Sequence, residues 1–261
     1  MIVKAKTSDG KNSVQVVGQS ADVVIGCQQF QHWLDTFEYG PMDLRLVSIQ
    51  SADIFDGGRV IFVKAETDVV DRANGKKIPG IVFLRGNAVT VLIFIECVET
   101  GEVYVLTVRQ PRIPVGQYRF CELVAGMMDK KDGVVGRALA ELWEEAHIRI
   151  SKRDLRYLGV SVPSTGGCDE QINSFYAHKK LRRKKIDYLL SRSWGAEGEN
   201  EQTLIRLQPI PEFVKSLATG DIIDGKALST LMLLLLKQAP YTVTQLLKEA
   251  GKQKPRKRGR K

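Results

Sequence analysis

Residues 125–148 read AGMMDKKDGVVGRALAELWEEAHI, a glycine-containing segment that leads into a helical pattern. Apolar residues recur at helical spacing over 134–148, so this part predicts a helix. Glu141, Glu144 and Glu145 would share one face of it, because positions three and four apart are neighbours on a helix. Like charges at this spacing repel each other. The face is therefore either solvated or neutralised by a cation.

Mixed strand and helix patterns surround this segment. Alternating or β-branched runs bounded by turn residues predict strands at 43–50, 59–70, 88–97, 102–108, 117–126, 156–162, 171–177 and 203–210. Helical patterns occur at 30–37, 211–220 and 224–238. We expect the last of these helices to be largely buried. Residues 1–25 are polar and only weakly patterned. The sequence therefore predicts an α+β fold.

Composition narrows the class of protein. The 261 residues are 43% hydrophobic, enough for one large or two small domains. No apolar run reaches the roughly 18 residues of a membrane span, and the first residues lack a signal-peptide pattern. We therefore expect a soluble intracellular protein, cytoplasmic or nuclear, with organellar import left open. Four widely spaced cysteines, without zinc-site spacing, are expected to be buried thiols.

Positive charge is concentrated in two segments. Residues 252–261 carry +7 and residues 179–185 carry +6, so that the rest of a chain of net charge +9 is at −4. We expect 252–261 to be disordered and 178–185 to be a solvated insertion. The alternative is that both segments contact the phosphates of RNA. The tail also fits a nuclear import signal.

The spacing within 125–148 resembles the signature of the Nudix hydrolases. That signature is Gly, five residues, Glu, seven residues, and then Arg-Glu-aliphatic-any-Glu-Glu-any-Gly-aliphatic. Gly126 begins it here, and the three glutamates stand at their expected positions. Asp132 replaces the first Glu, Ala140 replaces the Arg, and His147 replaces the Gly. These replacements leave activity retained or weakened, and a degenerate non-enzyme remains an alternative.

The resemblance covers roughly residues 40–238. LTVRQPRIPVGQYRFCELVAGMMD (106–129) and PSTGGCDEQINSFYA (163–177) look like the ADP-ribose and ADP-sugar diphosphatase branch, with plant-type ADP-sugar diphosphatases the most similar. The implied fold is a mixed β-sheet sandwiched between helices, with a β-rich N-terminal extension. The implied substrates are nucleotide sugars.

The resemblance also implies a domain layout. Residues 1–84 would form the extension, with a role in dimerisation or substrate binding. Residues 85–240 would form the hydrolase domain, and 241–261 a basic tail. Related enzymes are commonly dimers, so a homodimer is expected. Trp33 and Phe37 are expected to be core or dimer contacts rather than a platform for a base.

The chemistry of phosphoanhydride cleavage explains the carboxylates. A hard divalent cation takes oxygen ligands and neutralises phosphoryl charge. By resemblance, Glu141, Glu145 and the carbonyl of Ala125 would bind Mg²⁺, or Mn²⁺, with Glu144 acting close by. Arg137 could brace the glutamates in place of the missing arginine at 140, or could simply be solvated.

Three further groups come from the resemblance. Glu170 would position or deprotonate the attacking water, with Glu201 a weaker candidate. The alternative for the turn around Glu170 is a purely structural one. Arg112, and with less weight Arg109, would contact the substrate diphosphate, because a guanidinium can bind phosphate at two points. A surface arginine on a proline-stiffened loop is the alternative for Arg112.

Two functions follow from these residues. The first is metal-dependent hydrolysis of ADP-ribose or an ADP-hexose to AMP and a sugar phosphate. The second is a nucleic-acid-associated Nudix protein that binds RNA through its basic segments, with hydrolysis weak or redirected to RNA 5′ ends.

Overall fold

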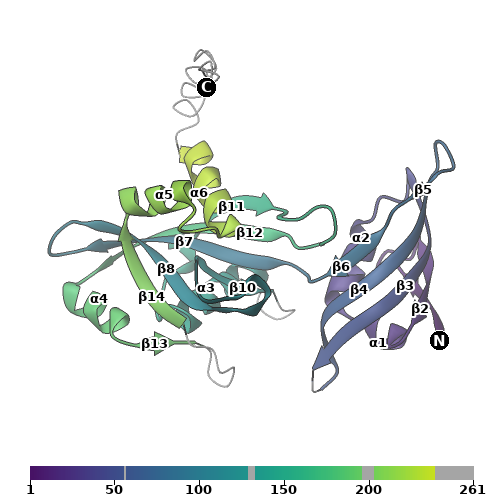
Figure 1. Cartoon of the computed structure of the whole chain (residues 1–261), viewed down its shortest axis with the longest axis horizontal. Coiled ribbons are helices and arrows are strands. Elements are labelled where there is room, and N and C mark those ends of the chain that lie inside the picture. The colour runs from purple at the N-terminus through teal and green to yellow at the C-terminus, as the bar shows by residue number, and fades with distance from the viewer. Residues whose placement is uncertain (56, 129–132, 196–202, 239–261) are drawn as a thin grey trace, which may run out of the picture. The chain divides into compact units, whose positions relative to one another are not determined.

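The chain is represented by a computed structural model that describes residues 1–55, 57–128, 133–195 and 203–238 (Figure 1). It groups into two compact units. The first unit contains Met1–Val89, Ala125–Ala138 and Val160–Asn173. The second contains Thr90–Val124, Leu139–Gly159 and the described part of Ser174–Lys261. The domain boundaries predicted at 84 and 240 stay a prediction.

The first unit is built on a six-stranded sheet of order β1-β2-β3-β4-β5, with β6 also paired to β4. Its elements are β1 (Ile2–Lys6), β2 (Ser13–Gly18), α1 (Ala21–Val24), α2 (Gln28–Thr36), β3 (Met42–Phe55), β4 (Arg59–Asp71), β5 (Lys77–Ile78) and β6 (Ile81–Leu84). Alternate residues of β4 are buried, as expected for a sheet with one covered face. Phe30 and Leu34 of α2 belong to the same core and are fully buried.

The second sheet has eight strands, in the order β11-β12-β7-β8-β14-β13, with β9 paired to β8 and β10 to β7. The strands are β7 (Ala88–Cys97), β8 (Val103–Arg112), β9 (Gln117–Glu122), β10 (Val124–Met127), β11 (Arg156–Ser161), β12 (Ile172–Leu181), β13 (Ser193–Trp194) and β14 (Thr203–Pro209). The helices are α3 (Gly133–Glu144), α4 (Arg183–Leu190), α5 (Ile210–Thr219) and α6 (Gly225–Gln238). Two short 3₁₀ turns are η1 (Ile113–Val115) and η2 (Lys152–Asp154).

Helices cover this sheet. Leu92 and Leu123 of the strand region share a core with Phe213 of α5 and with Ala227 and Leu234 of α6. Figure 1 draws α5 and α6 on the upper side of the sheet and α4 on the lower side. Strand β7 is buried along most of its length, as expected for a central strand covered on both faces. The predicted α+β architecture is confirmed.

Some local structure differs from the sequence pattern. Residues 1–25, which are weakly patterned, form two strands and a short helix, with Val14 and Val16 buried. The single strand predicted at 117–126 is divided into β9 and β10. Residues 178–185 are largely exposed, as predicted, but they have regular structure, because 178–181 complete β12 and 183–185 begin α4. Lys180 forms an ion pair with Glu96, and Nε2 of His178 lies 3.1 Å from the same carboxylate.

Helix α6 is also less buried than predicted. Its buried side chains are Ala227, Thr230 and Leu234. Leu228 is 56% exposed and Met232 is 46% exposed. The apolar residues of α6 continue around the helix, so their pattern did not indicate which face the sheet would leave uncovered.

Two simpler predictions can be compared with the structure. All four cysteines are thiols rather than disulfides, and Cys27, Cys97 and Cys121 are buried, whereas Cys168 is half-buried. Within the described residues, no helix combines the length and the apolar character needed to cross a membrane.

Candidate active site

The glutamate face of α3 is mostly buried. Glu141 is 4% exposed and Glu145 is 3% exposed, whereas Glu144 is half-buried. The amide of Glu145 still donates to the carbonyl of Glu141 at 2.9 Å, so helical geometry continues one residue past the end of α3. The solvated alternative is therefore wrong for Glu141 and Glu145. Buried acidic side chains one turn apart are stable only beside hydrogen-bond donors or positive charge.

Gln110 on β8 holds one of these carboxylates. Its side-chain Nε2 donates to Oε1 of Glu145 at 2.9 Å, and Gln110 is itself only 4% exposed. A neutral amide donor fixes the orientation of a carboxylate without neutralising its charge. An outer hydrogen-bonding partner of this kind is a common feature of metal-binding carboxylates.

A second polar group forms around Glu122, at the end of β9. Glu122 is 1% exposed and accepts from Nε of Arg112 at 2.6 Å and from Nζ of Lys226 at 2.9 Å. Asp224 lies 3.0 Å from Lys226 and accepts the backbone amide of Leu123. Burial acts to lower the pKa of Lys226, but the two carboxylates outweigh burial and leave that pKa raised. Lys226 is therefore charged, and the network fixes Arg112 at the end of β8.

Arg109, the other arginine predicted to contact the substrate diphosphate, does not occupy the same kind of position as Arg112. Arg109 lies in the middle of β8, where its backbone is opposite Cys121 on β9 and Leu204 on β14. Its side chain is half-buried. Arg137 is also half-buried, so the fully solvated alternative does not describe it.

His147 ends the helical segment at the position where the family signature has Gly. Its φ of 49° lies in the left-handed region, which non-glycine residues seldom adopt. Its amide donates to the carbonyl of Trp143 at 3.0 Å, the bond of a left-handed helix cap. The His147 ring lies between those of Trp143 and Trp194, at centroid distances of 3.8 and 4.4 Å. These ring contacts offset the cost of the backbone conformation.

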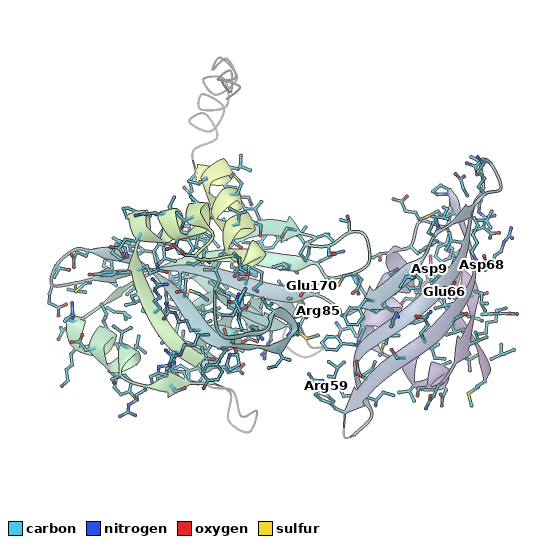
Figure 2. All side chains as sticks on the ribbon, in the orientation of Figure 1. Asp9, Arg59, Glu66, Asp68, Arg85 and Glu170 are labelled. Atoms are coloured by element: carbon cyan, nitrogen blue, oxygen red, sulfur yellow. The ribbon has the colours of Figure 1, made fainter. Side chains whose placement is uncertain are left out.

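Glu170 lies in the first unit, on a loop that is well anchored. Nε of Arg85 donates to Oε1 of Glu170 at 2.8 Å, and the two labelled side chains face each other in Figure 2. The neighbouring Asp169 accepts the backbone amides of Arg85 and Gly86. Phe83 on β6 forms a parallel bridge with Cys168. The carboxylate is thus held in place by a cation, and its predicted role as a base stays a prediction.

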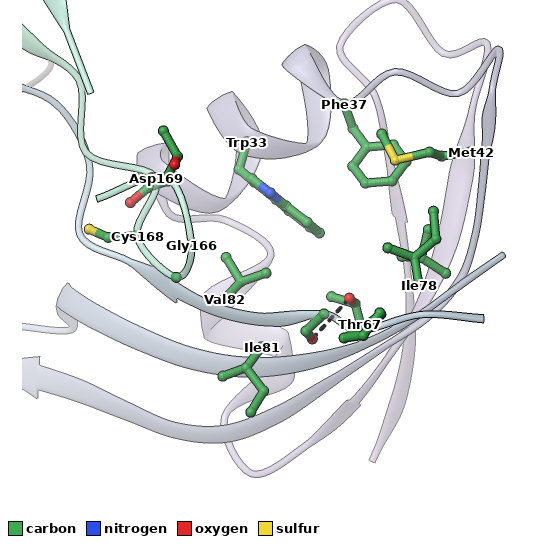
Figure 3. Close-up of a pocket in the computed structure, with 15 residues that line it drawn as sticks. Trp33, Phe37, Met42, Thr67, Ile78, Ile81, Val82, Gly166, Cys168 and Asp169 are labelled. Carbon is green, nitrogen blue, oxygen red and sulfur yellow. Dashed lines mark hydrogen bonds between the residues drawn. The ribbon is translucent and has the colours of Figure 1, made fainter. Parts of the chain in front are cut away.

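The same loop borders a cavity in the first unit (Figure 3). Trp33 of α2 and Phe37, the residue after that helix, contribute to its lining, as do Ile78, Val82 and Asp169. The volume is about 250 Å³, somewhat below the usual range for sites that enclose a drug-sized ligand. Trp33 and Phe37 also pack against the hydrophobic core of this unit, which agrees with the core role expected for them.

Comparisons with known proteins identify the family. No family model matches the chain. The chain is 36% identical over 211 residues to Nudix hydrolase 14, chloroplastic, from Arabidopsis thaliana, which covers 74% of this chain and 67% of that protein. The chain is a Nudix hydrolase. It is therefore an enzyme whose substrate derives from a nucleotide, and the recognition made from the glutamate spacing is confirmed.

A solved structure supports the fold of this Nudix hydrolase. A crystal structure of an ADP compounds hydrolase superposes with a TM-score of 0.50, covering 81% of this chain and 99% of that chain, at 17% sequence identity. At this identity the likeness shows the fold alone. Nudix hydrolases generally use divalent metals, and the oxygen donors of Glu141 and Glu145 fit a hard cation of that kind.

The structure does not test every residue predicted for the site. Asp132 and Glu201 lie outside the described residues. Within the described ranges, no cluster of three or more His, Cys, Asp or Glu side chains suited to a metal is found. The metal-binding role of Glu141, Glu145 and the carbonyl of Ala125, on β10, stays a prediction.

Sequence reasoning missed the residues that hold the predicted ones. Gln110 and Glu122 lie far in sequence from their partners Glu145 and Lys226, and Arg85 lies 85 residues from Glu170. One feature of the sequence could have pointed to such a partner, namely a polar residue, Gln110, inside an otherwise apolar strand. Gln110 ends a run of buried residues on β8, where an uncompensated amide would be costly.

Proposed function

We propose that this Nudix hydrolase cleaves the diphosphate of a nucleoside diphosphate sugar, with ADP-ribose and ADP-hexoses as the leading substrates. The products would be AMP and a sugar phosphate. The observation that carries the proposal is the burial of Glu141 and Glu145 on one helical face beside Gln110. The two similar proteins, a Nudix hydrolase and an ADP compounds hydrolase, support hydrolysis of a nucleotide diphosphate.

Glu141 and Glu145 would hold Mg²⁺ or Mn²⁺. When bound, the cation supplies positive charge to the phosphoryl oxygens and lowers the pKa of water. Gln110 keeps the carboxylate of Glu145 in one orientation, so that less reorganisation accompanies binding. Glu144, half-buried on the next position of the helix, is proposed to act in proton transfer.

Arg112 is proposed to bind the substrate diphosphate. Glu122 accepts from its Nε, which fixes the plane of the guanidinium. Because Lys226 also binds Glu122, the buried carboxylate is shared between two cations. A guanidinium held in one plane suits phosphate oxygens. Arg109 is the second candidate for binding the diphosphate. Glu170 is the proposed base that activates the attacking water.

A homodimer is proposed through the first unit. One face of its sheet carries Phe62, Ile81 and Phe83, with the rings of Phe62 and Phe83 5.3 Å apart. Ile81 is 61% exposed and Phe55, at the end of β3, is 64% exposed. Lys64 and Glu66 lie on the same face, opposite Phe83 and Ile81, so the face combines exposed apolar and charged side chains, as an interface core and its rim do. Ile81→Glu should convert a dimer, measured by light scattering, into a monomer, and an unchanged dimer mass would contradict this assignment.

The test of the hydrolase proposal is a substrate panel. Purified protein is incubated with Mg²⁺ or Mn²⁺ and with ADP-ribose, ADP-glucose, UDP-glucose and a 5′-triphosphorylated RNA, and the products are followed by ³¹P NMR. We expect AMP and a sugar phosphate from an ADP-sugar. Turnover confined to the RNA would support the second function, hydrolysis at RNA 5′ ends. The basic segment 252–261, to which part of that function was assigned, lies outside the described residues.

A further inference from the structure

A group of aromatic and basic side chains lies on the second unit, next to the helical segment that carries the buried glutamates. We call it the aromatic–basic cluster. Its members are Trp143, His147, Arg149, Lys185, Tyr188, Arg192 and Trp194. They come from α3 and the residues after it, from α4 and the residues after it, and from β13. The proposed hydrolase function uses none of them.

The rings of the cluster form a short stack. His147 lies between Trp143 and Trp194, with interplanar angles of 30° and 19°. Tyr188 stands at the side of Trp194, with the ring centroids 5.6 Å apart. Trp143 and Tyr188 are each 37% exposed, although large aromatic side chains are usually more deeply buried. The stack therefore presents aromatic surface to solvent.

The cations of the cluster lie over rings. The guanidinium of Arg149 is 4.3 Å from the centroid of Trp143. Lys185 and Arg192 each lie 4.7 Å from the centroid of Tyr188. In the part of the chain that the structure describes, none of these three forms an ion pair with a carboxylate. An aromatic face attracts a cation but does not cancel its charge.

The three charges lie around one stack of rings. Arg149 lies over Trp143, and Lys185 and Arg192 lie over Tyr188. Three cations gathered in this way create a positive potential, and such a surface attracts anions.

Other basic residues of the run 178–185 contact carboxylates, whereas Lys185 contacts none among the residues that the structure describes. His178 and Lys180 bind Glu96, and Arg183 binds Asp187. The charge of the run 178–185 is thus partly cancelled within the protein. Lys185, the last residue of that run, is the one that joins the aromatic–basic cluster.

We propose that the aromatic–basic cluster binds single-stranded nucleic acid. The planar guanidinium groups of Arg149 and Arg192, together with the exposed parts of the rings beneath them, offer surfaces against which unpaired bases stack. The same cations offer contacts to the backbone phosphates. A duplex would not present its base faces, and an acidic peptide would have no use for the rings. This binding is separate from nucleotide-sugar hydrolysis and does not depend on it.

The test is fluorescence anisotropy with the full chain. The probes are a fluorescein-labelled 12-nucleotide oligo(U) RNA, a 12-nucleotide oligo(dT) DNA and a 12-base-pair RNA duplex, each at two salt concentrations. We expect the single strands to bind at least about 5-fold more tightly than the duplex, and Tyr188→Leu to weaken single-strand binding at least about 5-fold, the loss of one stacked base. Arg192→Glu should reduce the slope of log affinity against log salt by about 0.7, the contribution of one single-strand phosphate. Tighter binding of oligo(U) than of oligo(dT) would assign the site to RNA.

Two matched variants control for non-specific effects. Tyr157→Leu removes another exposed tyrosine that has a lysine over its ring, and Arg153→Glu reverses an arginine whose side chain is 88% exposed. Neither should change binding by more than about 2-fold, and all four variants should retain the circular dichroism spectrum of the parent. The proposal is overturned if Tyr188→Leu and Arg192→Glu bind like the parent, if the controls lose as much affinity, if the duplex binds better, or if no probe binds.

Discussion

Replacing Glu145 by Gln removes one negative charge and preserves the shape of the side chain. Glu145 is 3% exposed, so solvent screens its charge little. At an effective dielectric constant of about 20, two unit charges about 4 Å apart interact by roughly 4 kcal/mol. The remaining carboxylate of Glu141 and water can compensate part of this loss. We therefore expect kcat to fall at least about 10²-fold, equivalent to about 2.7 kcal/mol.

The assay is steady-state hydrolysis of an ADP-sugar at saturating Mg²⁺. The fold should be unaffected, because the side-chain carbonyl introduced by Glu145→Gln can still accept from Gln110. Glu96→Gln is the matched control, since this carboxylate on β7 binds His178 and Lys180 at the surface and has no proposed catalytic role. A folded Glu145→Gln enzyme with near-parental kcat would refute the metal assignment.

The remaining predictions concern four other parts of the chain. Ala140→Arg restores the family residue at a half-buried position and should leave kcat unchanged or raise it; a large loss would mean that α3 packs differently from its relatives. Arg112→Ala should raise KM for an ADP-sugar at least about 10-fold, and an unchanged KM would remove Arg112 from the substrate site. The free energy of unfolding, measured by urea titration, should fall as the pH drops below about 6.5. The reason is that the pKa of His147 is lowered in the folded protein, so that the unfolded chain binds the proton more readily. His147→Gln should reduce this pH dependence, and a variant with the same pH profile as the parent would contradict the assignment to His147. Deleting 252–261 should leave ADP-sugar turnover close to the parental rate, and a large loss would show that the tail takes part in catalysis.

The glutamate helix could be predicted because its information is local. The spacing of Glu141, Glu144 and Glu145 follows directly from the helical period, and the left-handed cap at His147 follows from the position where the family has glycine. Their burial could not be predicted with the same ease. It depends on strands such as β8, whose contact with this helix is not encoded in the helix itself.

The partners of the predicted residues were missed for the same reason. Gln110, Lys226 and Arg85 act across 35, 104 and 85 residues of sequence, respectively. A single sequence provides helical and strand periods, but it does not show which polar residues meet after folding. The first two strands are a different case. SVQVVG at 13–18 does alternate, and Val14 and Val16 are buried, so the pattern was present but was given too little weight.

The aromatic–basic cluster illustrates the same limit at the surface. The basic run 178–185 was visible in the sequence, but its charges could not be divided into paired and unpaired ones. His147 was noted as a departure from the family glycine. Its ring contacts with Trp143 and Trp194 give that departure a physical basis.

The most direct test of the central proposal is the dependence of ADP-sugar turnover on Mg²⁺ concentration, measured for the parent enzyme and for Glu141→Gln. The parent should be inactive with EDTA and should saturate with Mg²⁺. Glu141→Gln should require at least about 10-fold more Mg²⁺ for half-maximal turnover, because one charged oxygen ligand is lost. Turnover that persists in EDTA, or an Mg²⁺ dependence identical in the two proteins, would contradict the proposal that Glu141 and Glu145 hold the catalytic cation.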